Sequence, residues 1–87
     1  MIADAVALRL AKHFAHKVPV TEHCGVTRVE TRFGAFELRP RGETLGIVLY
    51  PAEPEGEQRL REVVESHALR FARGEELRLE WERSDSS

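Results

Sequence analysis

Hydrophobic and polar positions recur with a helical period at the start of the chain. In residues 2–16 the apolar side chains fall every three or four positions, namely Ile2, Ala3, Val6, Ala7, Leu10 and Phe14, with His13 on the same face. This spacing is typical of a helix with one buried face. Pro19 predicts the end of the helix, because proline disfavours helical geometry in the residue before it.

Between residues 18 and 50 the pattern changes to short apolar runs that are separated by turn signals. The runs predict four strands, Val18–Glu22, Val26–Thr31, Ala35–Arg39 and Leu45–Tyr50. Pro19 in the first run indicates an edge strand or a strand start. The fourth run is apolar on both faces apart from Gly46, which indicates a central or covered strand.

A second helix and a last strand are predicted between Gly56 and Trp81. The helical stripe consists of Leu60, Val63, Val64, His67, Ala68 and Phe71. After Gly74 the period becomes two, and the side chains that share one face are Leu77, Leu79 and Trp81.

The predicted order αββββαβ favours an α+β fold, a two-layer sandwich with both helices on one face of a mostly antiparallel sheet. Residues 1–82 are expected to form one domain, and residues 83–87 a polar, disordered tail. If every element reverses direction, the helices run antiparallel and the last strand can pair with the first. His13 and His67 would then be displaced by about 10–15 Å along the helix axes, which disfavours a shared site.

Composition narrows the possible classes of function. The chain has 87 residues, 41% of them apolar and 32% charged, and a net charge of −2, which argues against a dedicated nucleic-acid binder. Cys24 is the only cysteine, so an internal disulfide is impossible and a reducing compartment is expected. No segment has the ~20 apolar residues that cross a membrane. We therefore expect a cytoplasmic protein, either a monomer or a weak homodimer.

The familiar catalytic signatures are missing from the sequence. It has no glycine-rich phosphate loop, no metalloprotease motif, no nucleophile elbow and no CxxC pair. Ser66 adjoins His67, but neighbouring helix positions do not face each other. The sequence leans towards a protein that is not an enzyme, and it indicates no particular cofactor.

Histidines are the residues with the most chemical potential. His13 and His16 are spaced i, i+3 and can share one metal ion, with His23 or Cys24 as a third ligand. The alternative is structural: His13 is a partly buried core histidine, and His16 caps the C-terminus of the first helix. His67 has the same two interpretations, and a buried imidazole needs a hydrogen-bonding partner. We favour a core histidine that fixes the second helix to the sheet.

Arginine dominates the positive charges, with eleven arginines against two lysines. The tight groups are Arg39/Arg41 and Arg70/Arg73, each of which can hold a carboxylate or a phosphate, although a solvated face is the simpler interpretation. The candidate residues for binding a ligand or a partner are His13, His16, Lys17, His67 and Arg70, and the candidate metal ligands are His13 and His16.

Three blocks of the sequence carry a family resemblance. They are Lys12-His13-Phe14-Ala15-His16-Lys17, then Phe33-Gly34, and finally Ser66-His67 followed by Arg70-Phe71-Ala72-Arg73-Gly74-Glu75-Glu76-Leu77-Arg78-Leu79-Glu80-Trp81. With them the chain resembles the bacterial domain-of-unknown-function family numbered 2218 over almost its whole length, while the Cys24-Gly25 turn is less similar. The resemblance implies a small stand-alone cytoplasmic protein without an established activity, in a family with some members encoded beside iron- and siderophore-related genes.

The sequence as a whole favours a non-catalytic module that binds a protein partner or a small ligand. Its binding surface would be the exposed sheet face or the corner from His13 to Lys17. The alternative is a metal- or iron-linked accessory protein that uses a histidine cluster.

Overall fold

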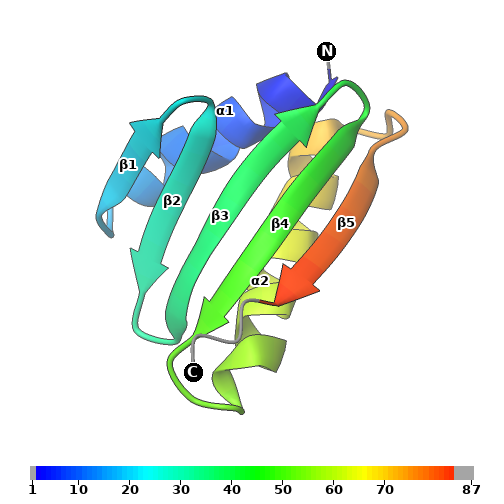
Figure 1. The fold of residues 1–87 in the computed structure, drawn as a ribbon. Coiled ribbons are helices and arrows are strands. Elements are labelled where there is room, and N and C mark those ends of the chain that lie inside the picture. Colours follow the sequence, from blue (N-terminus) through cyan, green and yellow to red (C-terminus); the bar gives the residue numbers. More distant parts are fainter. Residues whose placement is uncertain (1, 84–87) are drawn as a thin grey trace.

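A computed structural model describes residues 2–83 and confirms the predicted αββββαβ order (Figure 1). The elements are α1 (Ile2–Ala15), β1 (Val20–His23), β2 (Val26–Thr31), β3 (Gly34–Arg41), β4 (Thr44–Pro51), α2 (Gly56–Ala72) and β5 (Arg78–Arg83). Most boundaries lie within two residues of the prediction. Strand β3 continues two residues beyond its predicted end at Arg39, because Pro40 and Arg41 still pair with β4.

The strands form one sheet in the order β1-β2-β3-β4-β5. The first four make an antiparallel meander, which puts the proline-flanked β1 at an edge and the apolar β4 inside the sheet, as predicted. The predicted pairing of the last strand with the first is wrong, since β5 pairs in parallel with β4. The reason is the connection: α2 lies between β4 and β5, and such a helical crossover returns the chain beside the strand it has just left.

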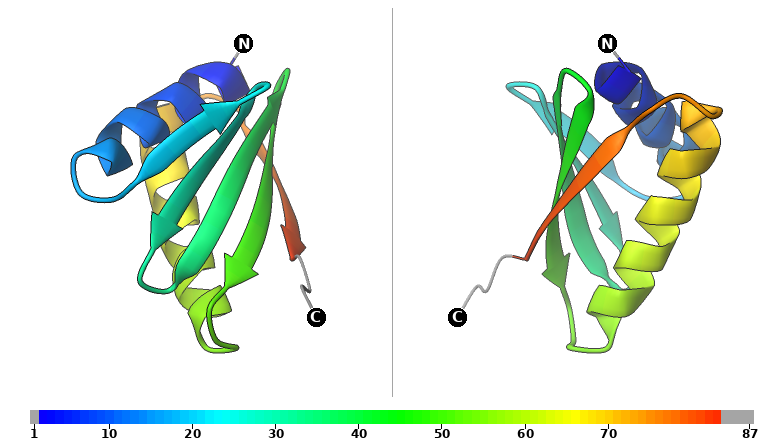
Figure 2. Two further views of the ribbon diagram at one scale, coloured as in Figure 1. Left: turned by 60° about the vertical axis from the view of Figure 1, so that its left-hand side comes forward. Right: turned by 90° about the vertical axis from the view of Figure 1, so that its right-hand side faces the viewer.

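Both helices cover the same face of the sheet, as predicted (Figures 1 and 2). Strand alternation decides which side chains meet them. The fully buried core is made up of Ala3, Val6, Leu10, Val29, Phe36, Leu38, Leu45, Ile47, Leu49, Leu60, Val64 and Ala68. The opposite, open face of the sheet carries charged side chains such as Glu37 and Arg39 together with two buried apolar ones, Ala35 and Val48.

The two helices cross on the sheet, with α1 passing over its upper part and α2 running along the strands (Figure 2). At the crossing Arg9 of α1 donates a hydrogen bond from Nη1 to the carbonyl oxygen of Phe71, at 3.2 Å. The ring of His13 lies 4.9 Å from that of His67, centroid to centroid. The expected separation of these two histidines is therefore wrong, because it assumed antiparallel helices, whereas the two helices cross.

Two loops at the other end of the sheet are pressed together. The amide of Ala52 donates to the carbonyl of Phe33 at 3.0 Å. A Cβ at Gly56 would lie 2.6 Å from that same Phe33 oxygen, and a Cβ at Gly34 would lie 2.7 Å from the Ala52 nitrogen. Only glycine permits such close backbone approaches. The turn between β2 and β3 is thereby fixed against the start of α2.

The C-terminal boundary differs from the prediction by one residue. Arg83, expected to begin a polar tail, is the last residue of β5, and its guanidinium lies 2.9 Å from a carboxylate oxygen of Glu57. The rest of the predicted tail, 84–87, lies outside the described residues. Neither α1 nor α2 has the length and apolar composition needed to cross a membrane.

Candidate functional site

The helix crossing brings together the residues that the sequence singled out. His13 comes from the last turn of α1 and His67 from the second half of α2. Phe14 stacks obliquely on His67 at 5.3 Å and edge-on against Phe36 of the core at 5.7 Å. Phe71 closes the other side, 5.8 Å from the His13 ring. The site is therefore an aromatic cluster that continues the hydrophobic core to the surface.

His67 is half-buried, and one of its ring nitrogens is hydrogen-bonded within its own helix. Its Nδ1 lies 2.7 Å from the carbonyl oxygen of Val63, one turn earlier. A carbonyl oxygen only accepts, so Nδ1 is the donor, and in the neutral ring Nε2 is left as an acceptor. The ring packs against His13 and Phe14 of α1. His67 thus links α2 to α1, and its predicted role of fixing α2 to the sheet stays a prediction.

The electrostatic environment of His13 is positive. Partial burial of the imidazole, followed by the charges of His67, Lys17, Arg70 and His16, lowers the pKa of His13. The side chains of His13, His16, Lys17 and Arg70 are exposed. We call these four residues and His67 the basic corner. The charges of the other four candidate residues thus all act to lower the pKa of His13.

The expected cap of α1 by His16 is provided by the backbone. The carbonyl of Phe14 accepts hydrogen bonds from the amides of Lys17 and Val18, both at 2.9 Å. These bonds satisfy a carbonyl that a helix end would otherwise leave exposed. The imidazole of His16 is therefore available on the surface.

Within residues 2–83 no three His, Cys, Asp or Glu side chains are grouped to hold a metal ion. The two residues proposed as a third ligand to His13 and His16 do not join them. His23 ends β1 and Cys24 occupies the β1–β2 turn, and both are exposed. A metal role for His13 and His16 stays a prediction.

The arginine pair Arg39/Arg41 lies on the open sheet face, where each member has a carboxylate partner. Arg39 contacts Glu37 at 2.9 Å, and Arg41 contacts Glu80 at 3.4 Å. Glu37 also accepts hydrogen bonds from Arg28 at 3.2 Å and from the Tyr50 hydroxyl at 3.1 Å. Because these arginines are already paired with carboxylates of the same face, the open face is a weaker candidate for an anion site than the basic corner.

Glu37 gives a test of this open-face network. Burial alone would raise the pKa of Glu37, but hydrogen bonds from Arg39, Tyr50 and Arg28 lower it below its ordinary value of 4.5. The carboxylate therefore contributes stability that is present above pH 4.5 and lost as the pH falls through its lowered pKa. We expect Glu37→Gln to reduce the free energy of unfolding by about 1 kcal/mol at pH 7, measured by urea denaturation.

The control for this prediction is Glu80→Gln, which breaks a longer pair in which both side chains are more than half exposed. It should change stability very little. The difference between wild type and Glu37→Gln should also shrink when the measurement is repeated near pH 3. An equal loss in the two variants would contradict a special role for Glu37.

Comparison with known proteins identifies the family. The family described as an uncharacterized protein conserved in bacteria, DUF2218, matches residues 2–82. The chain belongs to this family. The match spans both helices, the first four strands and all but the last residue of β5, so the basic corner lies inside the family domain. Searches of the curated proteins and of the solved structures found no significant match.

The sequence singled out the residues of the basic corner as candidates but did not indicate a second group of charges. Arg32 and Arg59 line a pocket with Phe33, far apart in the sequence and in no recognisable motif. Their meeting depends on the contact between the β2–β3 turn and the start of α2. Phe33-Gly34 was the only available signal, and it indicated a turn.

Proposed function

We propose that this protein is a non-catalytic binding module, and that its basic corner binds an acidic segment of a protein partner. The observation that carries the proposal is the approach of His13 to His67 at the helix crossing, where the charge of Arg70 on α2 also acts on His13. Lys17 and His16 extend the same positive environment. Carboxylates on a partner would supply the opposite charge.

Lys17 and Arg70 form no ion pair with a carboxylate of the described residues, so a partner's carboxylate does not have to displace one. Arginine offers a planar fork to a carboxylate, and the neighbouring lysine offers a mobile point charge. The exposed rim around the aromatic cluster of Phe14 and Phe71 can accept apolar side chains that flank acidic ones.

The experiment is a titration of the protein with a hexaglutamate peptide, followed by calorimetry at low salt. Lys17→Gln and Arg70→Gln are each expected to weaken binding about two- to five-fold, the range of an exposed ion pair. Lys12→Gln is the matched control, because Lys12 is an exposed lysine in the last turn of α1 whose charge is not among those that lower the pKa of His13. Equal weakening by all three variants would indicate a non-specific charge effect.

The pH dependence gives a second readout of the same site. His13 has a lowered pKa and faces His16 and Lys17 from its own segment, and His67 and Arg70 from α2. A bound carboxylate favours the charged imidazole, so peptide affinity should rise as the pH falls from 8 to 6. Affinity that is constant over this range, or that falls, would exclude His13 from the site.

A metal- or iron-linked accessory role with His13 and His16 is the second candidate. The observation in its favour is the 4.9 Å approach of His67 to His13, with Nε2 of His67 left as an acceptor. Lys17 and Arg70 in the same corner oppose it, because they repel a divalent cation.

Calorimetry with Zn²⁺, Ni²⁺ and Fe²⁺ separates the two candidates. A metal site would bind more weakly as the pH falls, since protons compete for the imidazoles, whereas the acidic peptide would bind more tightly. Saturable metal binding that is lost in both His13→Ala and His16→Ala would support the metal role. Its absence would leave the acidic-peptide proposal alone.

A further inference from the structure

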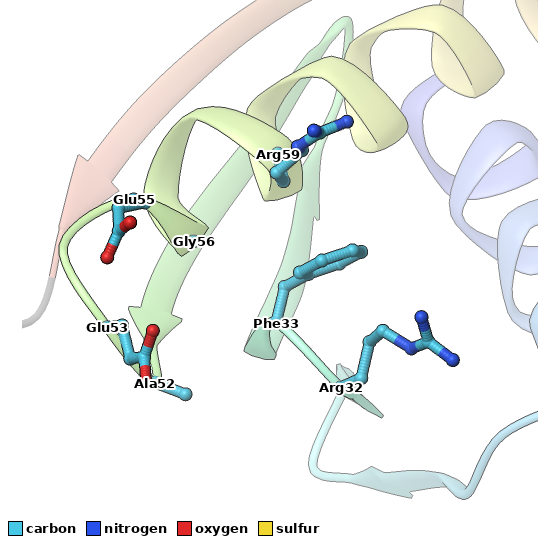
Figure 3. Close-up of a pocket in the computed structure, with 7 residues that line it drawn as sticks. All are labelled: Arg32, Phe33, Ala52, Glu53, Glu55, Gly56 and Arg59. Atoms are coloured by element: carbon cyan, nitrogen blue, oxygen red, sulfur yellow. The ribbon is translucent and has the colours of Figure 1, made fainter.

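A pocket lies at the opposite end of α2 from the basic corner. It has a volume of about 380 Å³ and is lined by residues of the β2–β3 turn and of the β4–α2 connection. Figure 3 shows the Phe33 ring between the side chains of Arg32 and Arg59, with the carboxylates of Glu53 and Glu55 at the other end of the pocket. The pocket therefore has a positive end, a negative end and an aromatic wall.

The four charged groups of this pocket are not paired with one another. No ion pair between described residues includes Arg32, Arg59, Glu53 or Glu55. All four side chains are exposed and can be reached by a ligand. Charged groups of both signs thus line one pocket, and they can form ion pairs with a ligand.

The backbone beneath the pocket is held in place. The hydroxyl of Thr31 donates to the Gly34 carbonyl at 2.7 Å and accepts from the Phe33 amide at 3.1 Å. The Phe33 carbonyl in turn bonds to Ala52 and lies directly against Gly56. Since both sides of the pocket are fixed to each other, a ligand does not have to order them, and binding costs less conformational entropy.

We infer that this pocket binds a zwitterionic amino-acid-like ligand with an apolar side chain. The carboxylate of the ligand lies towards Arg32 and Arg59, which match its geometry. Its ammonium group lies towards Glu53 and Glu55, and its apolar side chain covers the ring of Phe33. A ligand with a single charge would satisfy only one end of the pocket.

The test is a two-dimensional NMR titration of the full chain with L-leucine and with L-leucyl-L-leucine. We expect saturable shifts of the Phe33, Gly34 and Gly56 amides with at least one of the two, at millimolar concentration. The matched analogues are N-acetyl-L-leucine, which lacks the ammonium group, and L-leucinamide, which lacks the carboxylate. Each should bind at least five-fold more weakly. No saturable shift with either zwitterion, or equal affinity for an analogue, would overturn the inference.

Variants locate the binding and separate it from the basic corner. Arg59→Gln and Glu53→Gln should each weaken zwitterion binding at least five-fold, and the same spectra report whether the variant is folded. Arg70→Gln and Glu62→Gln are the controls, because both alter exposed charges elsewhere on α2. Loss of leucine binding in Arg70→Gln would place the ligand at the corner and overturn the inference. If Arg70→Gln does not weaken hexaglutamate binding, the proposed peptide site at the basic corner is contradicted, and the inference about the pocket is unaffected.

Discussion

Gly34→Ala is expected to destabilise the protein severely. Gly34 begins β3 at a φ of +126°, a conformation that side chains with a Cβ rarely adopt. An added Cβ would collide with the Tyr50 carbonyl and lie 2.7 Å from the Ala52 nitrogen. Both obstacles are backbone of the neighbouring strand and its exit, so they cannot move without separating β3 from β4. Backbone strain and overpacking together predict a loss of about 3–5 kcal/mol.

Gly25→Ala provides the matched control for this substitution. Gly25 also has a positive φ, of +79°, but no atom lies within 4 Å of the position a Cβ would take. Only the conformational cost remains, about 1 kcal/mol. Urea denaturation of the two variants and wild type measures the difference. If the two alanine variants were equally stable, the close contact between the β2–β3 turn and the β4 exit would be refuted.

Phe36→Ala is expected to have the second large effect. The Phe36 side chain in β3 is fully buried, and its ring makes an edge-to-face contact with the ring of Phe14. Its removal leaves a cavity between the sheet and α1 and should lower the free energy of unfolding by about 3–5 kcal/mol. Leu8→Ala is the control: Leu8 lies on the outer face of α1 with 58% of its surface exposed, and its truncation should change stability little.

The same substitution tests how the core supports the basic corner. Phe36 touches Phe14, and Phe14 touches His67, so a change in the core should reach the imidazoles. In Phe36→Leu, which keeps most of the buried volume, we expect the ring NMR signals of His13 and His67 to shift while the protein stays folded. Unchanged imidazole signals would mean that the corner is positioned by the helices alone.

Local patterns in the sequence were sufficient to predict the elements and their buried faces. Leu60, Val64 and Ala68 are spaced for one helical face, and all three are buried in α2. Phe36 and Leu38 alternate with Glu37 and Arg39, and this alternation correctly separates the core face of β3 from the open one. Each of these inferences needs only the period of the backbone, which is a local property.

The partner of the last strand and the meeting of the histidines were beyond such patterns. Whether β5 pairs with β1 or with β4 depends on how α2 crosses back over the sheet. The approach of His13 to His67 depends on the angle at which the two helices cross. The periodicity of side chains along one helix does not predict this angle. The assumption of antiparallel helices therefore predicted a separation that is too large.

The sequence by itself determined the α+β class, the core and the five side chains of the basic corner as candidates. Only the tertiary structure decided that His13 and His67 approach each other at the helix crossing, and that Arg32, Arg59, Glu53 and Glu55 line one pocket. The physical reason is that secondary structure follows from interactions between near neighbours in the chain, whereas a binding site is made by residues from different elements. Their distance is set by packing, through close contacts such as those of Gly34 and Gly56 with the neighbouring backbone.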